Sequence, residues 1–251
     1  MRQSFHRIAY EALDVCNAVT MAQIDLAIET TRLGPGLRAI DIGSGNGAVA
    51  IRLAERFGLH VDAVELDPDM AGLAASRIAA ASGSGSPLPI SLHVAPSARV
   101  LAQTGPFKLI VALGTTEPVG DGVRDPFGMF EGLRAHLVEG GWLLWGDLVW
   151  TDEPSVPLRQ IVEMSNSYAD DAGWRAAAAQ AGFAVVSAEV SSSEAWDTYA
   201  ATMQAAVAAW LAANPDHADA AAIAARAHQL DLMFTFGRGV MSFGLYLLRK
   251  A

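Results

Sequence analysis

The sequence predicts an α/β fold in which crossover helices cover a parallel sheet. Between residues 38 and 148, apolar runs of strand length alternate with longer segments of helical periodicity, which is the pattern of consecutive strand–helix–strand units. The short runs are rich in Val, Ile and Leu, as strands buried on both faces of a sheet are. A chain of 251 residues is long enough for one sizeable domain of this class, so we expect residues 1–251 to form a single domain.

The first part of the chain predicts five strands and the helices that connect them. The strands are expected at residues 38–42, 60–65, 90–94, 109–113 and 141–147. The helices are expected at residues 48–57, 69–81, 97–103 and 126–137. A Gly- and Ser-rich stretch at residues 83–87 predicts a loop within the domain, because the alternation resumes after it.

The second part predicts a helix at residues 174–180 and two further strands at residues 183–190 and 241–248. Between these strands, residues 191–238 are Ala-rich with apolar positions at helical spacing, which predicts a helical cap inserted between strands six and seven. Residues 1–33 are also helical in pattern and predict an N-terminal helical lid. The cofactor-binding core is then expected at residues 34–190 and 239–251.

Charge and composition exclude several classes of partner. The net charge is -10, and the 17 basic residues form no cluster, so nucleic acid is not an expected partner. One cysteine and six scattered histidines predict no metal site. No apolar run approaches about 20 residues, and no long apolar stretch follows the basic residues at the N-terminus. We therefore expect a cytoplasmic protein without a membrane partner.

A glycine-rich segment from Asp41 to Gly47 predicts a cofactor site. It places an acid at the end of the first strand and three glycines at alternate positions, followed by a helix. Glycines let a ligand approach the backbone, and a helix N-terminus directs unpaired N–H groups at a polar or anionic group. The second strand also ends in an acid, Glu65, whose carboxylate can accept both hydroxyls of a ribose.

The glycine spacing discriminates between cofactor classes. Dinucleotide-binding proteins favour GxGxxG, whereas this chain has Asp-x-Gly-x-Gly-x-Gly and then Ala48. A carboxylate at Asp41 would be badly placed beside a pyrophosphate, but it can organise the loop and attract the ammonium of an amino-acid moiety. The spacing favours S-adenosylmethionine over a nicotinamide or flavin nucleotide. A structural turn without a ligand is the remaining alternative.

The segment from Asp41 to Gly47, together with Glu65, resembles motif I and the following acidic strand end of class I S-adenosylmethionine-dependent methyltransferases. Residues 106–111 and 137–144 resemble the fourth and fifth strands of that family, and segments such as Cys16-Asn17 are similar to a bacterial subgroup of it. The resemblance implies a Rossmann-like, mostly parallel sheet of seven strands with the last strand antiparallel. It also implies contacts to the cofactor from Gly43, Ser44, Gly45, Gly47, Glu65 and Leu66, and we expect Asp41 and Gly114 to bind the cofactor as well.

One segment departs from the family pattern. Many members carry Gly-Asp-Ala after strand three, with the Asp accepting from the adenine amino group, whereas this chain has Ala95-Pro96-Ser97. Ser97 could contact the adenine in place of that carboxylate. The alternative is that Ser97 caps the helix that follows.

The methyl acceptor is expected at the loops that follow strands four, five and six, because ligands of open α/β sheets sit beyond the carboxyl ends of the strands. Methyl transfer needs an acceptor that is aligned with the methyl group. An amine acceptor must also lose a proton first, which a carboxylate can accept. Glu117 and Asp147 are the best-placed acids. The residues predicted to bind the acceptor are Asn17, Thr115, Trp150, Trp196, Tyr199 and Arg238.

The sequence as a whole predicts an S-adenosylmethionine-dependent methyltransferase with a small-molecule acceptor, which an amine would fit. Two alternatives remain open: a nicotinamide-nucleotide-dependent oxidoreductase that uses the same crevice, and a non-catalytic protein that binds S-adenosylmethionine. The helical cap could also serve as the surface of a homodimer.

Overall fold

The strands of a computed structural model follow the apolar runs of the sequence. The structure describes residues 3–83 and 86–251, so the predicted loop at 83–87 and the first two residues of the predicted lid fall partly outside it. The strands are β1 (Arg38–Ile42), β2 (His60–Glu65), β3 (Ile90–Val94), β4 (Phe107–Leu113), β5 (Leu137–Trp150), β6 (Ala169–Asp170), β7 (Phe183–Val190) and β8 (Met241–Lys250). The two-residue strand β6 is not among the predictions, and β5 is longer than predicted.

Helices occupy the predicted segments and one more, α7. They are α1 (Phe5–Glu11), α2 (Met21–Thr31), α3 (Ala48–Phe57), α4 (Pro68–Ser82), α5 (Ser97–Thr104), α6 (Pro126–Ala135), α7 (Val156–Val162), α8 (Asp171–Gln180), α9 (Ser193–Ala213) and α10 (Ala220–Gly237). Most begin at a residue that can cap the free N–H groups of the first turn. At α2 the Thr20 side chain accepts from the Gln23 backbone, and Gln23 accepts from the Thr20 backbone in return.

The sheet has the order β3-β2-β1-β4-β5-β8-β7, and the short strand β6 pairs with β5. All pairs are parallel except those of β8, which runs antiparallel to both β5 and β7. The predicted fold class, a Rossmann-like sheet that is mostly parallel with an antiparallel last strand, is therefore confirmed.

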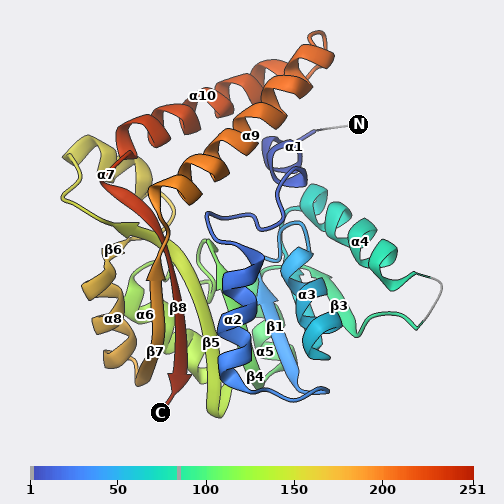
Figure 1. The fold of residues 1–251 in the computed structure, drawn as a ribbon, viewed down its shortest axis with the longest axis vertical. Helices are drawn as coiled ribbons and strands as arrows, with labels where there is room; N and C mark the ends of the chain where they lie inside the picture. The colour runs from blue at the N-terminus through green and yellow to red at the C-terminus, as the bar shows by residue number, and fades with distance from the viewer. Residues whose placement is uncertain (1–2, 84–85) are drawn as a thin grey trace.

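Helices cover both faces of the sheet (Figure 1). Successive residues of a strand point to opposite faces, and β1 shows this: Ala39 packs in the cluster that includes α2, α3 and α9, whereas Ile40 and Ile42 pack in the cluster formed with α5, α6 and α8. In α2, Ile24 and Ile28 are fully buried against the sheet. The second half of the predicted lid thus packs on the sheet, whereas residues 3–20 add apolar side chains to the same cluster from α1, which packs against α9.

The strand order reverses direction at β1, which has β2 on one side and β4 on the other. Ligands of open α/β sheets bind at such a switch point, outside the carboxyl ends of the strands. The turns that follow β1 and β4 therefore mark the expected site. The helices α9 and α10 leave the same edge of the sheet after β7 and run side by side across it, next to α1 (Figure 1).

Candidate functional site

A cavity of about 740 Å³ lies at the carboxyl edge of the sheet, above the switch point. It is lined by the turns after β1, β2, β3 and β4 and, from the N-terminal side, by α1 and the segment that follows α1. Nine of the predicted site residues are in its wall: Asn17, Gly43, Gly45, Glu65, Leu66, Ser97, Gly114, Thr115 and Glu117. The structure thus brings together residues that lie up to 100 positions apart.

The turn after β1 is built from backbone conformations that favour glycine. Gly43 and Gly45 have φ of +70° and +53°, in the left-handed region. A Cβ at Gly43 would lie 2.6 Å from Oγ1 of Thr115, and one at Gly45 would lie 3.2 Å from Sγ of Cys16. These glycines therefore allow the turn after β4 and the N-terminal segment to pack directly against the cofactor loop.

Asp41 and Ser44 support this loop from below rather than line the cavity. Both are buried, and among residues 3–83 and 86–251 no partner is found for Oδ2 of Asp41 or for the hydroxyl of Ser44. Burial raises the pKa of Asp41 to about 7, and the nearby charge of Glu65 adds to that effect. Gly47 likewise lies outside the wall formed by the described residues, where it is the N-cap of α3.

Glu65 joins two backbone segments at the floor of the cavity. One carboxylate oxygen accepts from the N–H of Gly45 at 2.8 Å, and the other accepts from the N–H of Asp67 at 2.8 Å. Burial raises the pKa of this carboxyl above its ordinary value. Each oxygen can accept more than one hydrogen bond, so the carboxylate can also accept from a ligand in the cavity.

Ser97 does not cap the helix that it begins. Pro96 occupies the N-cap position of α5, and within the described residues that helix has no side-chain cap. The capping alternative is therefore wrong. Ser97 instead lines the cavity beside Ala95 and Pro96.

The turn after β4 forms the opposite wall. The Thr115 hydroxyl donates to the carbonyl of Ile42 at 2.7 Å, which fixes this turn to the end of β1. Glu117 has φ +47°, a left-handed conformation that non-glycine residues adopt at a cost. Its carboxylate forms an ion pair with Arg124 at the outer side of the turn.

Besides Asp41, Ser44 and Gly47, five predicted site residues lie outside the cavity wall that the described residues form. They are Asp147, Trp150, Trp196, Tyr199 and Arg238. The first is buried with its carboxylate bonded to its neighbours, and the two tryptophans are buried in the core. The last is 70% exposed and pairs with an acid of α9, Asp197. The predictions that Asp147 acts on the acceptor and that the other four side chains bind it stay predictions.

The N-terminal arm, residues 3–20, supplies cavity residues that the sequence did not single out. His6 and Tyr10, one helical turn apart on α1, both line the cavity, and their rings lie 5.4 Å apart. Tyr199, predicted to bind the acceptor, backs this wall: its hydroxyl lies 3.5 Å from the carbonyl of Cys16. The spacing of two aromatic residues on one helical face is the only signal in the sequence that could have found them.

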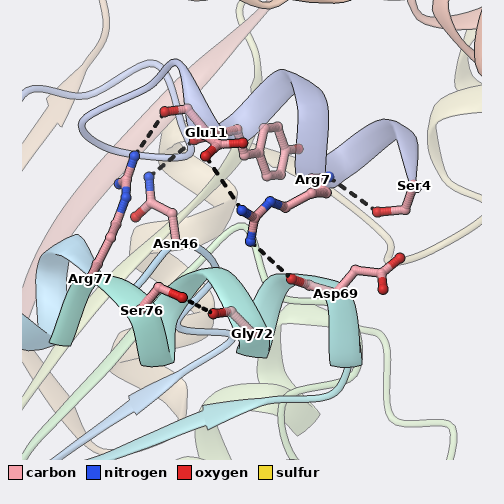
Figure 2. A network of polar contacts seen from close by, with 9 residues as sticks. Ser4, Arg7, Glu11, Asn46, Asp69, Gly72, Ser76 and Arg77 are labelled. Carbon is pink, nitrogen blue, oxygen red and sulfur yellow. Dashed lines mark hydrogen bonds and ion pairs between the residues drawn. The ribbon is translucent and has the colours of Figure 1, made fainter. Parts of the chain in front are cut away.

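A polar network holds the arm over the cofactor loop (Figure 2). Asn46 donates to the carbonyls of Tyr10 and Leu13 at 3.2 and 2.8 Å. Arg77 on α4 donates to the carbonyl of Glu11 at 2.8 Å. Because Asn46 belongs to the glycine-rich turn itself, the conformation of the turn and the position of the arm are coupled.

The cavity wall is acidic. Its ionisable side chains include the carboxyls of Glu65, Asp67 and Glu117, whereas no Lys or Arg is found in its wall within the described part of the chain. Burial, followed by the charge of Arg226, lowers the pKa of His6, so this ring is neutral at neutral pH. The site therefore presents more acceptors and negative charge than positive charge.

Residues 39–141, which contain the whole cofactor turn and the wall after β4, match a family model described as a methyltransferase domain. Over these residues the chain is similar to a methyltransferase domain, as its resemblance to the class I S-adenosylmethionine-dependent methyltransferases leads us to expect. Members of that family have an activated methyl donor with an amino-acid and a nucleoside part. The groups around the turn fit such a molecule, since Glu65 can accept ribose hydroxyls and the glycine turn leaves room for the amino-acid part.

Comparisons beyond this methyltransferase segment support the fold. A methyltransferase from Geobacter sulfurreducens, solved with S-adenosyl-L-homocysteine, is 21% identical, with a TM-score of 0.83 over 100% of this chain and 99% of that one. A similar complex from Thiobacillus denitrificans is 20% identical, with a TM-score of 0.82 over 100% and 99%.

A curated relative is similar over a shorter stretch. The tRNA1(Val) (adenine(37)-N6)-methyltransferase of Aeromonas hydrophila is 37% identical over 91 residues. The match spans 36% of this chain and 36% of that relative.

The described residues contain neither a candidate metal cluster nor a candidate membrane-spanning helix. No group of three or more His, Cys, Asp or Glu side chains in residues 3–83 and 86–251 is placed to hold a metal ion. In the same residues, no helix has both the length and the apolar character needed to cross a membrane.

Proposed function

We propose that this protein transfers a methyl group from S-adenosylmethionine to a small-molecule acceptor that carries an amine. The observation that carries the proposal is one continuous cavity with the glycine turn and Glu65 on one wall and Glu117 on the other. Three carboxylates and no Lys or Arg among its described lining residues favour a cationic or amine-bearing ligand.

The cofactor of the proposed enzyme is S-adenosylmethionine, which supplies a methyl group already activated on a sulfonium. Gly43, Gly45 and Gly114 permit close approach of its methionine part, and Asp41, which lies beneath the turn, favours an ammonium nearby when it is ionised. Glu65 accepts the ribose hydroxyls. Leu66, which is 65% exposed, flanks the adenine, and Ser97 contacts the adenine edge.

The turn after β4 would hold the acceptor. Thr115 and Asn17 lie in the same wall as Glu117, and the Nδ2 group of Asn17 donates to the carbonyl of Leu113 at 3.1 Å, which fixes that side chain. Glu117 would hold the acceptor ammonium and accept its proton, because transfer to nitrogen needs a free lone pair. To do so its carboxylate must leave Arg124, whose side chain is half-exposed.

In the proposed single domain, the arm of residues 3–20 is the lid, since α2 of the predicted lid packs on the sheet, and residues 191–238 are the cap. The arm contacts the cofactor loop through Asn46, and α1 packs against α9 of the cap. Together they shield the cavity from water. Methyl transfer requires this shielding because water would otherwise compete with the aligned acceptor as the nucleophile. The same packing gives the cap a structural role that needs no second copy of the chain.

A small molecule is favoured over RNA as the acceptor. The tRNA-modifying relative is similar over 36% of its length, so the comparison does not extend to most of that protein. The net charge of -10 and the acidic cavity wall oppose a polyphosphate.

The test is turnover with a panel of acceptors. Purified protein would be incubated with S-adenosylmethionine and, separately, with small amines, small carboxylic acids, phenols and tRNA, and S-adenosylhomocysteine formation would be measured. We expect turnover with one or more amines and a loss of at least about tenfold for Glu117→Gln. Turnover with tRNA alone, or an unchanged rate for Glu117→Gln, would contradict the proposed acceptor. Reduction of NAD, when NAD replaces S-adenosylmethionine in these mixtures, would favour the oxidoreductase.

A further inference from the structure

Asn166 lies behind the acceptor wall and uses both ends of its side-chain amide. It is 1% exposed and belongs to the segment between α7 and β6. Its Nδ2 group donates to the carbonyl of Thr115 at 3.1 Å, and its Oδ1 atom accepts from the N–H of Glu117 at 3.2 Å. One side chain thus holds the backbone on both sides of Thr116.

The orientation of this amide is determined by its partners. A backbone carbonyl can only accept and a backbone N–H can only donate, so Nδ2 must face Thr115 and Oδ1 must face Glu117. The carboxylate of Asp147 accepts from the same Nδ2 group at 3.3 Å and favours this orientation as well. Asp147 is itself held by the N–H of Leu148, which donates to it at 2.9 Å.

The turn needs such a support because its conformation is costly. A left-handed backbone at a non-glycine residue costs about 1 kcal/mol or more, and Glu117 has φ +47°. The same supporting segment also fixes the far end of the turn. Arg124 donates from its side chain to the carbonyl of Met164 at 3.2 Å, and its own carbonyl accepts from the N–H of Ser167 at 2.9 Å.

We propose that Asn166 is a positioning residue that holds the wall formed by residues 114–117 in the geometry needed for the ligand, and that Asp147 orients it. Neither side chain is in the cavity wall formed by the described residues, so both act through the turn. This assignment rests on the proposed function for its consequence in catalysis. The contacts themselves make a prediction that is independent of that function.

The test is Asn166→Asp, which keeps the shape of the side chain and replaces its donor with an acceptor. The new carboxylate would face the carbonyl of Thr115, which cannot donate a hydrogen bond to it, and the carboxyl of Asp147, which repels it when both carboxyls are ionised. The matched control is Asn214→Asp, the same chemical change at the end of α9, where the side chain donates to the carbonyl of Trp210 at 2.9 Å. If Asn166→Asp fails to fold, Asn166→Ala removes the bonds without adding charge.

Two measurements would be made on the full-length protein. Amide hydrogen exchange of the peptide covering residues 114–118 is expected to accelerate at least about tenfold in the Asn166 variant and not in the control. The dissociation constant for S-adenosylhomocysteine is expected to rise about tenfold, because Gly114 and Thr115 line the cavity.

A falling pH should reverse the effect in Asn166→Asp. When one carboxyl of the facing pair is protonated, it becomes a donor again. The ionisable neighbours are Asp147 on β5, Glu117 and Arg124 on the turn, and Tyr168 in the supporting segment. We therefore expect the affinity of Asn166→Asp for S-adenosylhomocysteine to recover as the pH falls from about 8 to about 6, and the affinity of Asn214→Asp to show no such change.

Three outcomes separate the two proposals. Unchanged exchange at residues 114–118 in Asn166→Asp would overturn the positioning role whatever the ligand. Changed exchange with an unchanged dissociation constant would overturn the link between this wall and the ligand. A wild-type protein that does not bind S-adenosylhomocysteine would count against the proposed function, while the exchange measurement would still decide whether Asn166 holds the turn.

Discussion

Asp147→Asn should change the pH dependence of stability by an amount that follows from burial. Asp147 is 3% exposed, and burial raises its pKa above its ordinary value of 3.8 to about 7, although the bonds from Leu148 and Asn166 act in the opposite direction. The difference between these two values corresponds to about 4 kcal/mol of stability once the carboxyl is ionised in both the folded and the unfolded state.

The sign follows from which state holds the proton. Below about pH 4 the carboxyl is protonated in both states, so its contribution does not change with pH. Between about pH 4 and pH 7 the folded state keeps a proton that the unfolded state has lost, so the free energy of unfolding falls as the pH rises. Above about pH 7 both states are ionised and the folded protein bears the whole cost of the buried charge.

The assay is urea unfolding of the wild type and Asp147→Asn at about pH 5 and about pH 8. The variant loses one hydrogen-bond acceptor, which costs about 1–2 kcal/mol at both values. The wild type additionally loses about 3 kcal/mol between the two values because of Asp147. We therefore expect the variant to be the less stable protein at the lower pH and to equal or exceed the wild type at the higher pH. Glu131→Gln, at an exposed position on α6, is the control for removal of a charge.

An identical difference between variant and wild type at the two pH values would refute this reasoning. It would mean that Asp147 exchanges no proton over this range in the folded protein. A difference that grows in favour of the wild type as the pH rises would require a carboxylate that the fold stabilises rather than penalises.

Two further changes test the packing around the cavity. Gly114→Ala places a Cβ 2.6 Å from Oδ1 of Asn17 at a backbone with φ +66°, so we expect a loss of about 1–2 kcal/mol in unfolding free energy. Adding Asn17→Ala to this variant should restore part of that free energy. If the effects of the two substitutions were fully additive, the two side chains would not be in contact. Arg77→Ala removes the bond to Glu11 that secures the arm. An exposed hydrogen bond contributes about 1 kcal/mol, so hydrogen exchange of residues 5–20 should accelerate severalfold, while Arg99→Ala, on α5, should leave it unchanged.

The fold and the cofactor loop were predictable because the signals that specify them are local. The strand Arg38–Ile42, the glycine turn and Glu65 lie within about 30 consecutive residues, and each follows from periodicity or glycine spacing. The short strand β6 and the helix α7 carry too few residues to show a periodic pattern. They were missed for that reason.

The wall beyond the cofactor loop depends on contacts between distant segments. Asn166 meets Glu117 across 49 positions, and Asn46 meets Tyr10 across 36, and nothing in a single sequence records such pairs. The order of strands predicted the correct edge of the sheet for Asp147 and Trp150, but not the side to which each side chain points. Ser97 shows the same limit at shorter range, because the position of the helix start decides whether a hydroxyl caps the helix or faces the cavity.

The most direct test of the account is a calorimetric titration with S-adenosyl-L-homocysteine, run on the wild type and on Glu65→Ala, with NAD as a second ligand. We expect micromolar binding of S-adenosylhomocysteine by the wild type and a loss of at least about tenfold in the variant, because the carboxylate at the floor of the cavity would no longer accept the ribose hydroxyls. Binding of NAD without S-adenosylhomocysteine, or S-adenosylhomocysteine binding that is unaffected by Glu65→Ala, would contradict the cofactor site described above.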